Sequence, residues 1–286
     1  MKTPGAGPIL CGLIGAGIRR SLSPALQEEE ARQHGLRMHY QLIDLDRSSR
    51  GAAALPGLID AVRIMGFDGL NITFPCKQSV IPLLDALSEE ARAAGAVNTV
   101  VRESSRLVGH NTDGTGWSWG LRRALPQADL SCVVLLGAGG AGSAISCELM
   151  RLGAARLLIV DSQASRASVL AERLNSMHGT GRASAAADIA AAMKEATGLV
   201  HATPTGMEKL PGMPLPASLL RPALWVSEAV YVPLETELLK AARRAGCATA
   251  DGGHMNVGQA VRGFKLFTGR DADAARMDAH FRRLVA

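Results

Sequence analysis

A strand, a glycine-rich turn and a helix follow one another without interruption near the middle of this chain. The apolar run 133–136 leads directly into the spacing G-x-G-x-x-G, and an apolar helical pattern continues to residue 152. The first glycine permits a tight turn, the second lets a pyrophosphate approach the backbone, and the third allows the helix to pack closely on the strand. Backbone N–H groups and the helix dipole then face the anion. The pattern predicts a Rossmann-type dinucleotide-binding domain, with cofactor contacts from Gly137, Ala138, Gly139, Gly140 and Gly142.

The strand after this helix ends in a carboxylate that bears on the choice of coenzyme. Residues 157–160 are apolar, and Asp161 follows where an acidic side chain accepts hydrogen bonds from the adenosine ribose hydroxyls. A carboxylate there repels a 2′-phosphate, and residues 162–165 include no arginine to neutralise one. We therefore predict NAD as the cofactor in preference to NADP. Arg166 is a candidate contact to the adenine, with a solvated helix position as the alternative. The structural alternative for the whole pattern is a turn used only for packing, with Asp161 as a helix cap.

Short apolar runs alternate with amphipathic helical patterns along the chain. The predicted buried strands are 9–14, 40–45, 69–73, 96–101, 132–136, 156–160, 199–202, 225–230 and 247–250. Alternation at this spacing predicts parallel βαβ units and an α/β fold whose sheets are covered on both faces. At 286 residues, the chain is long enough for two medium-sized domains.

A domain boundary is predicted where Asn111–Gly116 starts a new helix, before the second sheet begins near Ser131. The end of the chain carries two helical patterns that must pack on a domain already formed. We predict that residues 1–112 and 255–286 form an N-terminal α/β domain for the substrate. Residues 113–254 then form the dinucleotide-binding domain, and the C-terminal helices return to the first domain.

The composition argues against several classes of function. The net charge is +5, but arginine pairs are scattered and aromatic residues make up 3% of the chain, so we expect no nucleic-acid partner. No apolar run approaches the length of a membrane span, and we expect no membrane association. The five cysteines form no C-x-x-C pair, as is typical of reduced thiols in a cytoplasmic protein. The seven histidines lack metal-binding spacing, so no metal site is expected. A monomer or homodimer is expected.

Polar clusters stand at the ends of the predicted strands of the first domain, where open α/β sheets bind ligands. They are 21–24, 71–77, 95–99 and 110–114, and together they offer hydroxyls, an amide, an ammonium and a carboxylate. Such a set suits a small polyhydroxylated carboxylate. Each residue alone also has a structural explanation: Ser23 as a helix N-cap, Asn98 in a turn, Asp113 as a helix cap and Lys77 as a surface charge.

Taken together, these clusters make the chain resemble the shikimate dehydrogenase family over essentially its whole length. The motifs S-x-S-P, N-x-T-x-P-x-K, A-G-A-V-N-T, N-T-D-G and G-A-G-G occur in this order, followed by A-T-P-x-G-M at 202–207 and D-G-G-x-M at 251–255. The resemblance implies a two-domain enzyme of the shikimate pathway, which leads to the aromatic amino acids. Such an enzyme interconverts a cyclic polyol carboxylate and its 3-keto form by hydride transfer to a nicotinamide.

The resemblance also implies a role for individual residues. Ser21, Ser23 and Tyr231 would hold the substrate carboxylate, and Thr73, Asn98 and Gln259 would bind ring hydroxyls. Thr203, Pro204, Val230, Gly252 and Met255 are similar to positions on the nicotinamide side. Lys77 and Asp113 look like the catalytic pair. An ammonium beside a carboxylate can take up the hydroxyl proton or stabilise the developing alkoxide, and lysine can exchange a proton where arginine cannot.

Departures from the family pattern bear on substrate and coenzyme. Asp161-Ser162-Gln163 stands where NADP-using members typically have Asn-Arg-Thr, so the chain is most similar to the NAD-using quinate/shikimate branch. Quinate-tolerant members often have Thr where Ser23 stands, and Glu228 replaces a common Asp. Shikimate, quinate or both are therefore the expected substrates. The alternatives are a relative acting on an altered analogue such as an aminoshikimate, or a catalytically silent ligand sensor on the same fold, against which the presence of both Lys77 and Asp113 argues.

Overall fold

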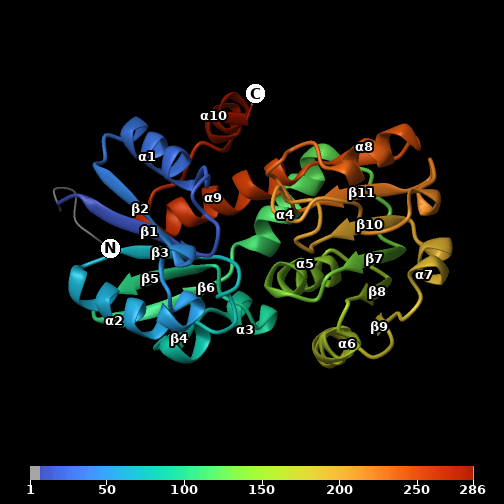
Figure 1. Cartoon of the computed structure of the whole chain (residues 1–286), viewed down its shortest axis with the longest axis horizontal. Coiled ribbons are helices and arrows are strands. Elements are labelled where there is room, and N and C mark those ends of the chain that lie inside the picture. The colour runs from blue at the N-terminus through green and yellow to red at the C-terminus, as the bar shows by residue number, and fades with distance from the viewer. Residues whose placement is uncertain (1–6, 286) are drawn as a thin grey trace. The chain divides into compact units, whose positions relative to one another are not determined.

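The chain divides into two compact units in the computed structural model, which describes residues 7–285 (Figure 1). The first unit contains the described residues up to Thr112 together with those from Gln259 onward, and the second is Asp113–Gly258. The division falls inside helix α9 (Gly252–Thr268). The sequence-based boundary at residue 255 lies in the same helix.

The first unit is built on a six-stranded sheet in the order β2-β1-β3-β5-β6-β4. Its strands are β1 (Ile9–Gly15), β2 (Met38–Asp44), β3 (Gly69–Ile72), β4 (Ala86–Leu87), β5 (Thr99–Glu103) and β6 (Arg106–His110). Its helices are α1 (Ser23–Gln33), α2 (Leu55–Met65), α3 (Glu89–Ala94), α10 (Ala274–Val285), the C-terminal part of α9 and the 3-10 turns η1 (Leu45–Arg47), η2 (Gly51–Ala54) and η3 (Ile81–Leu83).

This first sheet is mixed, so the prediction of parallel strands is wrong for β5. β1 pairs in parallel with β2 and β3, whereas β5 pairs antiparallel with both β3 and β6. The physical reason is the short connection between β5 and β6. Only Ser104 and Ser105 separate these strands, and two residues can close an antiparallel hairpin but not a parallel crossover. The amino end of β5 consequently lies at the edge of the sheet where β1, β3 and β6 end.

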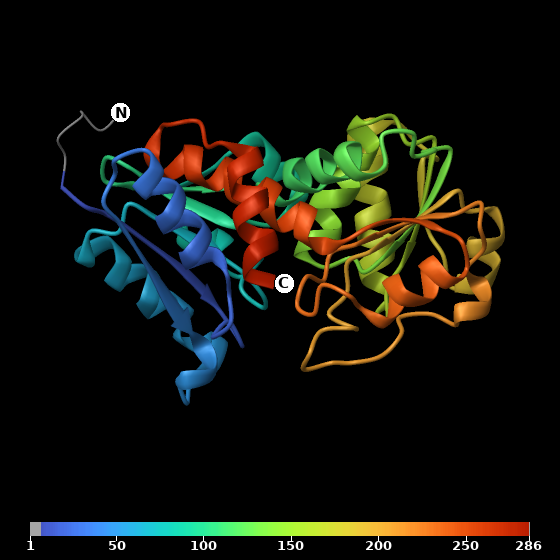
Figure 2. The ribbon, with the colours of Figure 1, turned by 90° about the horizontal axis from the view of Figure 1, so that it is seen from above.

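Hydrophobic clusters cover both faces of the first sheet. One cluster joins Leu70 and Ile72 of β3 to apolar side chains of α2. The other joins Cys11 and Leu13 of β1 to Phe267 of α9. A Cβ atom on Gly69 would lie 2.3 Å from the ring of Phe267. The ring can pack against this strand because glycine has no side chain. Helices α1 and α10 lie side by side in this unit (Figures 1 and 2).

The second unit has a parallel six-stranded sheet in the order β12-β11-β10-β7-β8-β9. Its strands are β7 (Cys132–Leu136), β8 (Arg156–Val160), β9 (Ala183–Ala185), β10 (Gly198–His201), β11 (Trp225–Glu228) and β12 (Ala248–Ala250). Its helices are α4 (Asp113–Ala124), α5 (Gly140–Arg151), α6 (Ala164–His178), α7 (Ile189–Glu195), α8 (Glu237–Arg244), the start of α9 and the 3-10 turn η4 (Ala217–Leu219). The order is that of a Rossmann fold, with its topological switch point between β7 and β10. The predicted fold class is confirmed.

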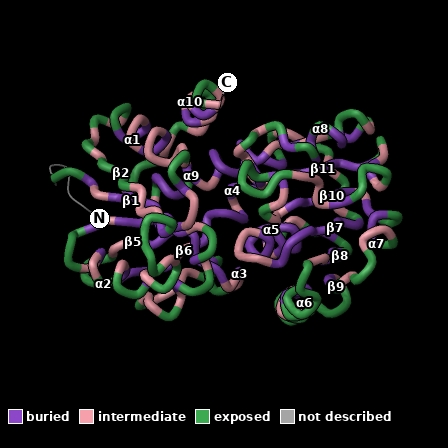
Figure 3. The backbone as a smooth tube through the Cα atoms, in the orientation of Figure 1, coloured by how far each residue is buried: buried purple, intermediate pink, exposed green. Residues whose placement is uncertain are grey.

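Alternate residues of the second sheet face opposite layers of helices. Val133 and Leu135 belong to a cluster with α4, α5 and α6, whereas Val134 and Leu136 belong to one with α7 and α8. Figure 3 shows the central strands β7, β10 and β11 buried, whereas many residues of α6 are exposed. In the part of the chain that the structure describes, no helix has the length and apolar character needed to cross a bilayer.

Candidate active site

The polar clusters of the first unit meet at one edge of its mixed sheet. Asn98 connects two of the strands there, because its carbonyl accepts the N–H of Ile72 (2.8 Å) and its N–H reaches the carbonyl of His110 (3.1 Å). The carbonyl of Lys77 accepts the N–H of Val97 (2.7 Å). These main-chain contacts bring the segment that follows β3, the one that precedes β5 and the end of β6 together. The structure therefore places Thr73, Lys77 and Asn98, which are far apart in sequence, at a common edge.

Two serine hydroxyls adjoin at the start of α1. Ser21 Oγ lies 3.1 Å from Ser23 Oγ and accepts the Ser23 N–H (3.3 Å). Ser23 is the first helical residue, and Leu22 stands at the N-cap position without a side-chain hydrogen bond, so Ser23 is not the cap that the structural alternative supposed. Both serines are partly exposed. Paired hydroxyls at a helix N-terminus are suited to a carboxylate.

A chain of buried hydrogen bonds fixes the carboxamide of Asn98. The Tyr40 hydroxyl donates to Asn71 Oδ1 (2.6 Å), and Asn71 Nδ2 donates to Thr99 Oγ1 (3.0 Å). Asn98 Oδ1 then accepts the Thr99 hydroxyl (3.0 Å) and the Thr112 N–H (2.8 Å). All five residues are at most 7% exposed. Because two protein donors point at Oδ1, the network sets Asn98 Nδ2 as the donor end of the amide.

The remaining predicted substrate residues and the predicted catalytic pair are divided between the two units. Lys77 is partly buried and belongs to the first unit, whereas Asp113 is 4% exposed and is the first residue of α4 in the second. Gln259 lies on α9 in the first unit, and Tyr231 is half-buried in the segment after β11 of the second unit. A negative charge at the start of a helix is favoured by the helix dipole, which suits Asp113.

The glycine-rich turn has the geometry that its spacing predicts. Gly137 adopts φ +102, and a Cβ atom on Gly142 would lie 1.9 Å from the Gly137 carbonyl oxygen, so α5 packs directly on the turn. A Cβ atom on Gly139 would meet no atom within 4 Å, which leaves the backbone open to an approaching phosphate. The turn connects β7 to α5 at the switch point, and these residues fit a dinucleotide.

Asp161 at the end of β8 is held against this turn. Its Oδ2 atom accepts the Ala138 N–H (2.8 Å), and its Oδ1 atom accepts the Gln163 N–H (2.9 Å). A carboxylate oxygen has a second acceptor position, so these contacts orient the group and still allow it to accept from a ribose hydroxyl. Arg166, on α6, is exposed.

The residues predicted for the nicotinamide side follow neighbouring strands of the second sheet. Thr203 comes after β10, and its Cγ2 atom would lie 3.0 Å from a Cβ atom on Gly137. A Cβ atom on Gly252 would lie 2.2 Å from the carbonyl oxygen of Val230. Pro204, beside Thr203, is exposed. Met255 is placed differently from these, because its side chain is 8% exposed and belongs to the hydrophobic cluster behind the sheet.

Sequence reasoning missed a buried ionisable pair beside these residues. His201 was considered only as one of several histidines without metal spacing, and Glu228 only as a replacement. The two side chains contact each other (2.8 Å) and are fully buried. The available signal was positional, since each residue is the last of an apolar parallel strand and the two strands are neighbours. Within residues 7–285, no group of three or more His, Cys, Asp or Glu side chains is arranged to hold a metal ion.

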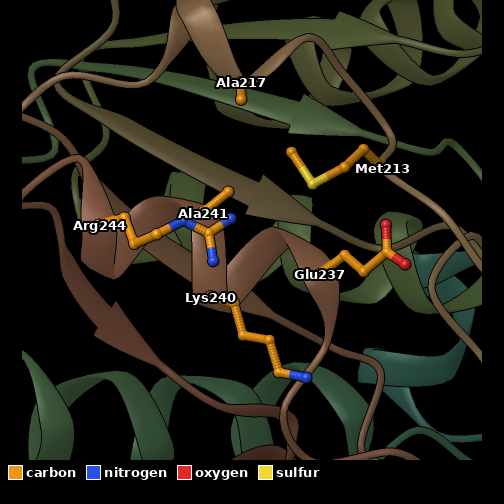
Figure 4. Close-up of a pocket in the computed structure, with 6 residues that line it drawn as sticks. All are labelled: Met213, Ala217, Glu237, Lys240, Ala241 and Arg244. Atoms are coloured by element: carbon orange, nitrogen blue, oxygen red, sulfur yellow. The ribbon is translucent and has the colours of Figure 1, made fainter.

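A surface pocket of the second unit is lined by none of the predicted site residues. It is lined by Met213, Ala217, Glu237, Lys240, Ala241 and Arg244, most of which lie on α8 (Figure 4). None of these side chains belongs to the predicted substrate, catalytic or cofactor sets. The polar edge of the first sheet and the glycine-rich turn of the second unit, not this pocket, therefore hold the candidate site residues.

Comparisons with known proteins agree with the geometry. Residues 13–100 match the model of the shikimate dehydrogenase substrate binding domain. A shikimate dehydrogenase (NADP(+)) from Streptomyces avermitilis is 57% identical over 278 residues, which cover 96% of each chain. A quinate/shikimate dehydrogenase (NAD(+)) from Corynebacterium efficiens is 45% identical and covers 96% of this chain and 97% of its own.

A solved structure is similar over the same extent. The quinate dehydrogenase from Corynebacterium glutamicum in complex with NAD superimposes with a TM-score of 0.88 at 43% identity, covering 96% of this chain and 99% of that one. Sequence motifs, the two-unit fold and these relatives lead to one conclusion. The chain belongs to the shikimate dehydrogenase family.

Proposed function

We propose that this chain is an oxidoreductase that interconverts shikimate, quinate or both with the corresponding 3-dehydro acid, using NAD in preference to NADP. The observation that supports the proposal is that Thr73, Lys77 and Asn98 share one edge of the first sheet, while Ser21 and Ser23 adjoin at the start of the helix that follows β1. Together these residues offer paired hydroxyls for a carboxylate, an amide and a hydroxyl for ring oxygens, and an ammonium for the reacting alcohol. The glycine-rich turn of the second unit supplies the matching phosphate contacts.

The proposed chemistry is oxidation of a secondary alcohol. A nicotinamide, when bound, accepts the hydride from the carbon that bears the hydroxyl. Lys77 takes up the hydroxyl proton as the C=O bond forms, and it returns this proton when the reaction runs in reverse. Asp113 is the proposed carboxylate of this catalytic pair, and its negative charge would favour a protonated amine. Asn98 holds a ring hydroxyl through its Nδ2 donor, which the network behind it keeps in place.

The preference for NAD rests on the local electrostatics of Asp161. Similarity does not select the coenzyme, because the relative at 57% identity is named for NADP and the one at 45% for NAD. The Asp161 carboxylate is fixed beside the phosphate-binding turn by two backbone N–H groups. A 2′-phosphate brought to the same ribose would add about −1.5 to −2 charges next to this carboxylate. The repulsion disfavours NADP.

The test is a matrix of substrates and coenzymes. Formation of reduced coenzyme is followed at 340 nm with shikimate and with quinate, each with NAD and with NADP, for the wild-type chain and for Lys77→Met. We expect turnover with NAD, and a loss of at least about 100-fold in kcat for Lys77→Met. Tight binding of either acid without turnover would support the ligand sensor instead. Turnover restricted to an amino-substituted acid would support the analogue-specific alternative.

Asp161→Asn tests the coenzyme assignment separately. The variant keeps the size of the side chain and one amide oxygen for the backbone contacts, but it removes the charge. We expect the ratio of kcat/KM for NAD to that for NADP to fall in Asp161→Asn. A wild-type preference for NADP, or an unchanged ratio in the variant, would refute the role given to Asp161.

A further inference from the structure

A buried histidine and glutamate join the two strands that carry the predicted nicotinamide-side residues. His201 is the last residue of β10, Glu228 is the last residue of β11, and the two are opposite each other in the parallel register. His201 Nδ1 lies 2.8 Å from Glu228 Oε1, and neither side chain is exposed. A buried carboxylate is tolerated only when it is paired and hydrogen-bonded, so the contacts of both residues need to be followed outward.

Glu228 connects to two further segments. Its Oε1 atom also accepts the Val230 N–H (3.0 Å), and its Oε2 atom accepts the Thr236 hydroxyl (3.0 Å). Thr236 in turn accepts the Leu239 N–H (3.2 Å) and caps α8. Two donors, the Val230 N–H and the Thr236 hydroxyl, each point at one oxygen of Glu228, which suits an ionised carboxylate. Such a carboxylate only accepts, so the proton between the pair sits on His201 Nδ1.

The other ring nitrogen of His201 then determines the direction of the Thr203 hydroxyl. His201 Nε2 lies 2.5 Å from Thr203 Oγ1, and Thr203 Oγ1 also accepts the Thr205 N–H (3.3 Å). With its proton on Nδ1, a neutral imidazole accepts at Nε2. Thr203 therefore donates its single hydroxyl proton inward to His201. What the hydroxyl presents on its partly exposed side is a lone pair.

Thr203 is well placed to use that lone pair on a coenzyme. It lies next to Gly137 of the phosphate-binding turn, and Val230, held by the same carboxylate, lies against Gly252. The carboxamide of a nicotinamide carries N–H donors, which are the complement of an oriented acceptor. A hydroxyl that turned freely would discriminate less between a donor and an acceptor at this position.

We propose that His201 and Glu228 are positioning residues that hold the Thr203 hydroxyl as an acceptor for the nicotinamide carboxamide N–H. The inference rests on the proposed function, because it requires that the second unit binds a nicotinamide coenzyme. The buried pair would touch neither substrate nor coenzyme. It would act on the recognition of the nicotinamide only through the Thr203 hydroxyl. Replacing the pair should alter coenzyme recognition through Thr203 and not through a general loss of structure.

The test compares two reduced coenzymes by fluorescence titration of the purified chain. One is NADH, and the other is its 3-acetylpyridine analogue, which retains the ring carbonyl but has no carboxamide N–H. We expect the wild-type chain to bind NADH about three- to tenfold more tightly than the analogue, as one hydrogen bond would give. Thr203→Val should lose this preference, and Thr203→Ser, which restores the hydroxyl, should recover it.

The pair itself is tested by the double variant His201→Leu with Glu228→Leu. Replacing a buried polar pair by apolar residues of similar size can preserve folding, and thermal unfolding verifies this. We expect the double variant to lose the preference for NADH as Thr203→Val does, and the triple variant to show no further loss. Glu228→Gln, which keeps an acceptor oxygen toward His201, is the matched control and should retain the preference.

Two results would overturn the inference. One is a folded double variant whose preference for NADH equals that of the wild-type chain, which would make the pair structural only. The other is an equal affinity of the wild-type chain for NADH and the analogue. Failure of the wild-type chain to bind either compound would instead refute the proposed function, so the two failures are distinguishable.

Discussion

Replacing Thr99 by valine tests whether the buried network of the first unit positions Asn98. The two side chains have the same shape, but valine removes a hydroxyl that accepts from Asn71 Nδ2 (3.0 Å) and donates to Asn98 Oδ1 (3.0 Å). Thr99 is 0% exposed, so no water replaces the lost partner. Asn71 Nδ2 retains the Asn98 carbonyl (3.1 Å), and Asn98 Oδ1 retains the Thr112 N–H (2.8 Å). Each side-chain amide loses one hydrogen bond and keeps another, so the expected loss of stability is about 1–3 kcal/mol.

The assay pairs equilibrium urea unfolding with steady-state kinetics for shikimate and quinate. We expect Thr99→Val to lower the stability by this amount and to raise KM several-fold, because the amide of Asn98 is no longer fixed. Thr99→Ser keeps the hydroxyl and should restore KM while recovering most of the hydrogen-bond energy. A destabilised Thr99→Val with an unchanged KM would show that Asn98 does not bind substrate. A variant as stable as the wild-type chain would refute the energetic reasoning itself.

Three further predictions concern the stability of single elements. Gly142→Ala places a Cβ atom 1.9 Å from the Gly137 carbonyl oxygen, so we expect α5 to shift, a lower melting temperature and loss of NADH binding in a fluorescence titration. Burial would raise the pKa of Glu30, but hydrogen bonds led by that from Arg276 hold it below 4.5. The stabilisation by the Glu30 carboxylate is therefore complete above its pKa in the unfolded state, and it is lost as the pH falls through its pKa in the folded state. The midpoint of urea unfolding should fall less between pH 5 and pH 3 in Glu30→Gln than in the wild-type chain. Burial lowers the pKa of His110 below 6.5, so the unfolded state binds this proton first on acidification. Stability should decline as pH falls below about 6.5, with a shallower decline in His110→Gln; an identical slope in both would exclude His110 as the cause.

The second unit was predictable in detail because its signals are local. Gly137 and Gly142 have the roles that their spacing assigns, and alternate residues of β7 face opposite helical layers as a sheet covered on both faces requires. The mixed sheet of the first unit was not predicted. The alternation of apolar residues predicts which side chains of a strand face the core, but it does not predict whether the strand runs parallel or antiparallel to its neighbours. The two serines between β5 and β6 were the signal that a hairpin, not a crossover, connects them.

Motifs predicted the candidate site residues, whereas the residues that orient them became visible only in the tertiary structure. Asn98 belongs to a recognisable motif, but the donors that orient it do not. Tyr40 is 31 positions from its partner Asn71 in the sequence, and Thr112 is 14 positions from its partner Asn98. Only the pairing of the strands brings these partners into contact. The start of α8, by contrast, is set by a local hydrogen bond. The helix begins at Glu237, because the hydroxyl of Thr236 provides the cap.

The loop that connects β5 and β6 lies at the opposite end of the hairpin from the candidate site residues of the first unit. Ser104 and Ser105 are exposed at one end of the hairpin, and Asn98 and Thr112 lie beyond its other end. Five strand residues at about 3.3 Å each put roughly 16 Å between the two ends. A fluorophore or short peptide inserted at the tip would thus be connected through two strands to the edge that we propose as the substrate site. It would report on occupancy from a distance without adding bulk at the proposed site.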